Sequence, residues 1–302
     1  MGELAAPATR SGFVALAGRP NVGKSTLANA IIGAKVAIVS DKPQTTRRAI
    51  RGVATGPDWQ LVLVDLPGVQ RPRDALTERM QNRVERELAD ADACVLVVNC
   101  EQGIGPGDRF LADLLRPGAG SIPVTIAANK TDRTSPARIA ATLQAAADLD
   151  VAQDIYAVSA RTGAGVEGLT DHLVGLLPPG PFYFSAGQRS DQEPMVLLAE
   201  LVREQILART REEVPHAVEV EVLDIRNPRP DLVLIEAVVL SETESQKGIL
   251  IGAGGRMIKS IGVAARRAIQ RELGTQVHLD LSVRVRRHWR TDERLLDRLG
   301  IE

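Results

Sequence analysis

Apolar and polar residues follow two different patterns along the 302-residue chain. Up to about residue 177, short apolar runs alternate with segments whose apolar residues recur at a helical period. Such an alternation is typical of a mostly parallel sheet that helices cover on both faces. The predicted strands are Phe13–Ala17, Arg48–Ala54, Gln60–Val64, Ala93–Asn99, Pro123–Ala128 and Ile155–Ser159, and the predicted helices are Lys24–Ile32, Ala75–Ala89, Asp108–Leu115, Pro136–Ala147 and Val166–Leu176.

The pattern changes after the stretch LLPPGPFYFSAGQRSDQEP, whose proline and glycine content is typical of a domain boundary. Beyond it the sequence predicts a helix, two strands separated by the turn RNPRP, two further helices and a last strand in QVHLDLSVRVRR. The three predicted helices are Met195–Arg209, Thr243–Leu250 and Arg256–Leu273. We therefore predict a first domain over residues 1–180, a linker over 181–193 and a second domain of the α+β class over 194–302.

Composition narrows the class of protein only modestly. A hydrophobic content of 44% and a net charge of -1 are ordinary for a globular protein, and 3% aromatic residues argue against stacking of many bases. Cys94 and Cys100 share one apolar run, as expected of buried free thiols in a reducing compartment. The first twelve residues lack an apolar signal core, and no run approaches the ~20 residues of a membrane span. We expect a cytoplasmic protein.

The segment GRPNVGKS, from Gly18 to Ser25, follows a predicted strand and begins a predicted helix. This is the setting that a phosphate-binding loop requires. Backbone N–H groups of such a loop bind phosphate oxygens, Lys24 reaches the terminal phosphates, and the Ser25 hydroxyl binds Mg²⁺. The residues predicted to line this loop are Gly18, Arg19, Pro20, Asn21, Val22, Gly23, Lys24, Ser25 and Thr26.

The tetrapeptide NKTD, from Asn129 to Asp132, ends another predicted strand and indicates which base is bound. The Asp132 carboxylate can accept two hydrogen bonds from the edge of guanine, whereas adenine presents a different edge. Lys130 is expected to lie along the base plane and the phosphate-binding loop. A weaker motif, SAR, would support the base from the end of the next strand through Ser159, Ala160 and Arg161.

Two further motifs lie between the phosphate-binding loop and NKTD. The segment DLPG ends a predicted strand and comprises Asp65, Leu66, Pro67 and Gly68. Asp65 would hold Mg²⁺ through water, and the Gly68 N–H would sense the γ-phosphate. In QTTRR a threonine can ligate Mg²⁺ only when GTP is present, which makes this segment a switch. Thr46 is the preferred candidate and Thr45 the second.

These motifs, at these spacings, resemble the TrmE–Era family of GTPases, in the branch that carries a C-terminal type II KH domain. The resemblance implies an α/β P-loop GTPase domain followed by an α+β KH domain, with GTP or GDP and Mg²⁺ as ligands. It implies catalytic roles for Lys24, Asn21, Thr46 and Gly68. Ras-like GTPases place a water-orienting glutamine where this chain has Val69. In GTPases with PNVGKS, Asn21 can instead help to hold a K⁺ beside the phosphates.

The second glycine-rich loop, GAGGRM, lacks the lysine and hydroxyl that a triphosphate site needs. It fits the G-x-x-G loop with which KH domains clamp single-stranded nucleic acid. The surrounding stretch from Glu244 to Arg290 holds ten Lys and Arg against three Asp and Glu, which indicates an anionic partner. Family members often have a lysine between the glycines, and Arg256 and Lys259 would replace it here. The predicted RNA-binding residues are Gly252, Ala253, Gly254, Gly255, Arg256 and Lys259.

The expected function is that of a GTP-hydrolysing switch joined to an RNA-binding domain. The resemblance implies that the RNA is 16S ribosomal RNA near its 3′ end and that the protein assists small-subunit assembly. We expect a monomer. The alternative is a membrane-associated signalling GTPase whose basic C-terminal part contacts lipid at the inner face of the cell membrane. A P-loop small-molecule kinase is disfavoured because NKTD and SAR would have no role in it.

Overall fold

The computed structural model describes residues 9–69, 73–116 and 122–301, and the chain divides into two compact units. Residues 1–8, which include most of the N-terminal stretch assessed above for a signal, lie outside the described part. The first unit comprises Met1–Ala37, Thr46–Pro72 and Thr77–Asp191, and the second comprises Ile38–Thr45, Arg73–Leu76 and Gln192–Glu302. The short segment Ile38–Thr45 is therefore grouped with the C-terminal part of the chain, although the first unit surrounds it in sequence.

The first unit is built on a six-stranded sheet with the order β2-β3-β1-β4-β5-β6. Its strands are β1 Arg10–Ala17, β2 Ile50–Thr55, β3 Trp59–Asp65, β4 Ala93–Asn99, β5 Val124–Asn129 and β6 Asp154–Ala157. Only the edge strand β2 is antiparallel to its neighbour, so the predicted mostly parallel sheet is confirmed. Its parallel strands place their carboxyl ends at one edge, where the predicted site motifs follow β1, β3 and β5.

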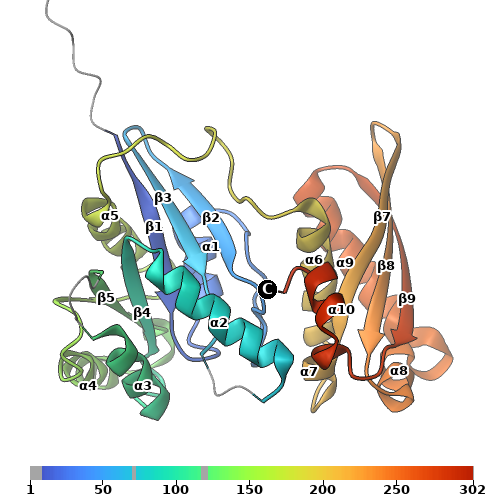
Figure 1. Cartoon of the computed structure of the whole chain (residues 1–302), viewed down its shortest axis with the longest axis horizontal. Helices are drawn as coiled ribbons and strands as arrows, with labels where there is room; N and C mark the ends of the chain where they lie inside the picture. The colour runs from blue at the N-terminus through green and yellow to red at the C-terminus, as the bar shows by residue number, and fades with distance from the viewer. Residues whose placement is uncertain (1–8, 70–72, 117–121, 302) are drawn as a thin grey trace, which may run out of the picture. The chain divides into compact units, whose positions relative to one another are not determined.

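Helices cover both faces of this sheet, as Figure 1 shows. They are α1 Lys24–Ile32, α2 Ala75–Ala89, α3 Pro106–Leu115, α4 Pro136–Ala147 and α5 Val166–Leu176. One core cluster joins α1 and α5 to the sheet, and two other clusters join α2, α3 and α4 to it. Every residue of β4 is buried, and Cys94 and Cys100 are both closed to solvent. Burial raises the pKa of Cys94 to about 12 and also raises the pKa of Cys100.

The predicted linker, residues 181–193, is largely bound to the first unit. Gln60 on β3 is fully buried, and its side-chain oxygen accepts backbone N–H bonds from Tyr183 and Phe184 at 2.8 and 2.9 Å. Its amide nitrogen donates to the Phe184 carbonyl at 2.9 Å. One buried glutamine thus satisfies the backbone of a proline- and glycine-rich stretch, and the boundary between the units falls after Asp191.

The second unit contains a three-stranded sheet of order β7-β8-β9, with β7 antiparallel and β9 parallel to β8. Its strands are β7 Glu219–Arg229, β8 Leu232–Ser241 and β9 Gln276–Val285, and its helices are α6 Pro194–Leu207, α7 Val214–Ala217, α8 Glu244–Ile251, α9 Arg256–Leu273 and α10 Glu293–Arg298. Leu198 of α6 and Ile261 and Ile269 of α9 pack with the sheet in one core cluster. The α+β class predicted for this part is confirmed.

Candidate functional site

The phosphate-binding loop wraps around the buried ammonium group of Lys24. Its Nζ donates to the carbonyls of Gly18 and Arg19 at 2.9 and 3.1 Å. Gly23 has φ 103°, and a Cβ there would lie 2.3 Å from the Asn129 amide nitrogen, so only glycine fits this position. The loop ends where α1 begins, which leaves the unpaired N–H groups of that helix N-terminus available for an anion.

The base-recognition motif is joined to this loop by hydrogen bonds. Asn129 donates from Nδ2 to the Val22 carbonyl at 3.0 Å and accepts the Ala160 N–H at Oδ1, also at 3.0 Å. Lys130, which has φ 66°, donates from Nζ to the Asn21 carbonyl at 2.6 Å. The motifs GRPNVGKS, NKTD and SAR, which are distant in sequence, therefore meet at one site.

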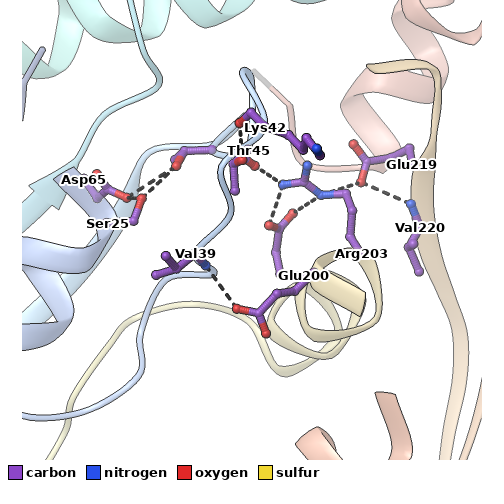
Figure 2. Close-up of polar contacts among 11 residues, drawn as sticks. Ser25, Val39, Lys42, Thr45, Asp65, Glu200, Arg203, Glu219 and Val220 are labelled. Carbon is purple, nitrogen blue, oxygen red and sulfur yellow. Dashed lines mark hydrogen bonds and ion pairs between the residues drawn. The ribbon is translucent and has the colours of Figure 1, made fainter. Parts of the chain in front are cut away.

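Three oxygen atoms from three motifs converge beside the loop. Ser25 Oγ lies 2.5 Å from Asp65 Oδ2 (Figure 2) and 3.0 Å from Thr46 Oγ1, which is 3.5 Å from Asp65 Oδ2. The other carboxylate oxygen of Asp65 is buried and has no hydrogen-bond partner among the described residues. Magnesium prefers such hard oxygen ligands. The hydroxyls and the unpartnered carboxylate oxygen fit a Mg²⁺ ion.

The structure distinguishes the two candidate threonines by the partners of their hydroxyls. The Thr46 hydroxyl faces Ser25 and Asp65, whereas the Thr45 hydroxyl donates to the Lys42 carbonyl at 2.6 Å. The Thr46 hydroxyl therefore lies where it could reach a metal ion beside Ser25 and Asp65, whereas the Thr45 hydroxyl closes a turn within its own segment.

Burial shifts the pKa values of two charged residues in the site, Lys24 and Asp65. Burial lowers the pKa of Lys24 to about 8, although the nearby charge of Asp65 opposes this shift. Burial likewise raises the pKa of Asp65 to about 6, against the effects of Lys24, Ser25 and Thr46. Loss of hydration disfavours the charged form of each side chain. A bound phosphate would therefore stabilise the charged form of Lys24, and a bound cation would stabilise that of Asp65.

Arg19, which is predicted to line the phosphate-binding loop, forms side-chain contacts that support this loop. The Arg19 guanidinium pairs with the buried Asp108 at 2.8 Å and donates to the Gly103 carbonyl at 3.3 Å, so it braces the loop against the start of α3. The sequence did not predict a role for Asp108, because an acidic residue near the start of a helix is ordinary.

Val69 packs against two core clusters, so its side chain has no role in orienting water. A Cβ on Gly68 would lie 2.8 Å from the Pro20 nitrogen, which shows how closely DLPG approaches the phosphate-binding loop.

The second glycine loop connects α8 to α9 in the second unit. Gly252, Gly254 and Gly255 have φ values of 69°, 59° and 76°, in the region that favours glycine. A Cβ on Gly254 or Gly255 would meet nothing within 4 Å, so the outer side of the loop is open. The Arg256 side chain donates to the Ala253 carbonyl at 3.2 Å, whereas Lys259 is exposed one turn into α9.

A groove of about 350 Å³ lies next to this loop, between α9 and β9. Ile258, Val263 and Leu281 give it an apolar floor, and Lys259 and Arg266 give it positive charge. Asp280 adds one carboxylate to the same lining. An open glycine loop beside a basic, partly apolar groove suits the sugar-phosphate backbone and the bases of a single strand.

Known proteins match this chain along both units. Residues 13–130 match the family described as 50S ribosome-binding GTPase, and residues 213–290 match the KH domain family. GTPase Era of Mycobacterium avium (strain 104) is 44% identical over 294 residues, covering 96% of this chain and 98% of the relative. GTPase Era of Mycobacterium tuberculosis (strain ATCC 25177 / H37Ra) shows the same identity and coverage.

Two solved structures share the fold of the whole chain. One is Era in complex with MgGDPNP and nucleotides 1506-1542 of 16S ribosomal RNA, with a TM-score of 0.92, 31% identity, and 97% of this chain and 99% of that chain covered. The other is a variant of Aquifex aeolicus Era bound to GDP and aluminium fluoride, with a TM-score of 0.92, 30% identity and the same coverage.

Proposed function

This chain belongs to the Era family of GTPases, and from that premise we propose a GTP-hydrolysing switch whose second unit binds 16S ribosomal RNA near its 3′ end. In this role it assists assembly of the small ribosomal subunit. The observation that carries the RNA assignment is the open loop Gly252–Gly255 beside the basic groove of α9 and β9. The solved Era complex holds RNA of this kind, and it supports the proposal for this chain.

The first unit binds and hydrolyses GTP with residues from four motifs. Backbone N–H groups of the phosphate-binding loop and Lys24 bind the phosphates, and Asp132 accepts hydrogen bonds from guanine. Ser25, Thr46 and Asp65 would hold Mg²⁺, which would neutralise negative charge on the phosphates. The Gly68 N–H would contact the γ-phosphate and report its presence.

Hydrolysis by the isolated protein is proposed to be slow. Val69 is packed into the core where Ras-like GTPases have glutamine, so no side chain at that position orients water. A K⁺ ion held with the help of Asn21 would supply positive charge beside the phosphates. Such a cation would replace the charge that other GTPases obtain from an arginine.

The proposed function is tested by RNA binding of the full chain in the presence of a GTP analogue. The three RNAs are 16S nucleotides 1506-1542, a shuffled RNA of the same composition, and a fragment of large-subunit RNA. Preferential binding of the first supports the proposal. The large-subunit fragment is included because the description of the family matching residues 13–130 names the 50S ribosome. Equal affinity for all three RNAs, or preference for the large-subunit fragment, contradicts the RNA assignment.

The membrane-associated alternative is weaker. One described stretch, Glu244–Leu273, would pass as a membrane span by length and by a mean hydropathy of 1.2. The loop Gly252–Gly255 divides this stretch into α8 and α9, and the apolar face of α9 packs in the core of the second unit. We propose a monomer in the cytoplasm, which cell fractionation and light scattering test directly.

A further inference from the structure

Helix α6 of the second unit carries a buried cluster of charge that the GTP and RNA sites do not use. Glu200, Arg203 and Glu219 are 3%, 0% and 0% exposed. Arg203 binds Glu200 through Nη2 at 2.6 Å and through Nε at 3.2 Å, and its Nε lies 3.6 Å from Glu219. Burying such charges costs free energy, and apolar side chains of similar size would often be as stable or more so. The cluster therefore suggests a role other than stability.

The same guanidinium binds a backbone carbonyl of the segment Ile38–Thr45. Arg203 Nη2 donates to the Thr45 carbonyl (Figure 2). The adjacent Glu204 accepts the Val39 N–H at 3.1 Å. Neighbouring residues of α6 thus hold the two ends of this segment. Because the segment is grouped with the second unit, these contacts belong to that unit's own packing.

One peptide bond separates this contact from the proposed metal ligand. The Thr45 carbonyl and the Thr46 N–H share a rigid, planar peptide group. A hydrogen bond that holds the carbonyl also holds the orientation of this peptide plane. The plane in turn orients the backbone of Thr46. The Thr46 hydroxyl lies 3.0 Å from that of Ser25. Arg203 is therefore linked to the metal site through a single peptide plane.

We propose that Arg203 is a positioning residue for the nucleotide switch, holding the Thr45 carbonyl so that Thr46 is presented to the metal ion of bound GTP. The inference rests on the proposed function of the first unit. Under this proposal, α6 of the RNA-binding unit raises the affinity for GTP relative to GDP. The reason is that the switch threonine binds the metal ion only in the GTP-bound state. By thermodynamic linkage, GTP must in turn stabilise the contact between Arg203 and Thr45.

The test uses full-length variants and the affinities of a GTP analogue and of GDP in Mg²⁺. Arg203→Lys keeps the charge between the glutamates but loses the planar fork that reaches Glu200 and Thr45 together. We expect the affinity for the GTP analogue to fall about tenfold and that for GDP to change less than about twofold. In a Thr46→Ala background, Arg203→Lys should cause no further loss, because both changes act through one residue.

A second variant covers the case in which Arg203→Lys fails to fold. Replacing the cluster together, with Glu200→Gln, Arg203→Met and Glu219→Gln, removes its three buried charges at once and still removes the donor to Thr45. Arg209→Lys is the matched control, since the Arg209 side chain binds Gln205 and Ser260 rather than the segment Ile38–Thr45. Both affinities of this control should equal those of the wild type.

Hydrogen exchange provides a readout independent of affinity. In the wild type, the GTP analogue should protect Ile38–Thr45 and α6 more than GDP does, and the cluster variants should lose this difference. The proposal is overturned if both variants keep the wild-type preference for the GTP analogue, or if they weaken GDP and the analogue equally. Failure of the wild type to bind either nucleotide would instead overturn the proposed function.

Discussion

Ser159 donates a hydrogen bond of 2.8 Å to one carboxylate oxygen of Asp132, across 27 positions of sequence. The second oxygen of Asp132 lies 3.9 Å from the Arg161 guanidinium. The carboxylate is therefore oriented by the SAR motif before any base is present. Orientation in advance lowers the cost of binding guanine through two hydrogen bonds.

Asp132→Asn should exchange the base preference. An amide presents a donor where guanine also donates, so the affinity for GTP should fall by about a hundredfold or more, and xanthosine triphosphate should bind better than GTP. Competition between the two nucleotides measures this directly. An unchanged affinity for GTP would show that Asp132 does not face the base.

Hydrolysis should be several-fold faster in K⁺ than in Na⁺. Val69 packs in the core and cannot orient the attacking water. A K⁺ ion held with the help of Asn21 at the phosphate-binding loop would instead supply positive charge beside the phosphates. Single-turnover hydrolysis in each salt is the measurement, and Asn21→Ala should lose the difference. Equal rates in both salts would count against a potassium site, as would full stimulation of the variant.

Nucleotide affinity should decline as pH rises above about 8. The pKa of Lys24 is near 8 in the nucleotide-free protein, and a bound phosphate raises it because phosphate stabilises the charged form. Binding therefore takes up a proton where free Lys24 is neutral, and the affinity falls as pH rises through that pKa. Titration of GDP binding between pH 7 and 10 tests this, and a flat profile would contradict it.

Thr46→Ala and Thr45→Ala should behave differently. Loss of the Thr46 hydroxyl should weaken binding of a GTP analogue in Mg²⁺ by about tenfold, or about 1.4 kcal/mol. Loss of the Thr45 hydroxyl removes a bond to the Lys42 carbonyl and should leave the magnesium dependence unchanged. Magnesium titrations of both variants decide between them, and the reverse result would reassign the ligand to Thr45.

Gly255→Asp should weaken binding to single-stranded RNA by about tenfold or more, because a carboxylate would occupy the open side of the loop and repel phosphate. Gly274→Asp is a close control: Gly274 has φ 64° and open space around it, but it caps the far end of α9. Both substitutions strain the backbone similarly, so only the first should affect RNA. Equal losses in the two variants would indicate strain rather than an RNA contact.

Local patterns were sufficient to predict most of the first unit. The helices α1, α2, α4 and α5 begin and end where the apolar period predicts, because each buries one continuous stripe against the sheet. The strand predicted from Arg48 begins instead at Ile50, which pairs with Asp65, the last residue of β3. In the part of the chain that the structure describes, the pairing of β2 with β3 starts at Ile50, and periodicity alone does not reveal where a partner strand ends.

Interactions between distant residues account for what the sequence did not predict. The turn predicted at RNPRP is shorter, since β7 continues to Arg229 with an irregular register, and an edge strand tolerates Pro228. In the sequence Gln60 resembles any other strand residue, and its role is visible only from its hydrogen bond with the distant Tyr183. Arg203 meets the Thr45 carbonyl across 158 positions, so its role could not be inferred from the pattern of α6.

The two native cysteines make this chain convenient for site-specific chemistry. Thiol reagents attack the thiolate, and both Cys94 and Cys100 are inaccessible, with pKa values raised by burial. A cysteine introduced at Val39, a residue that is 42% exposed, would therefore be alkylated first without removal of either native thiol. A fluorophore attached there would report in real time on the environment of Ile38–Thr45 as nucleotides exchange.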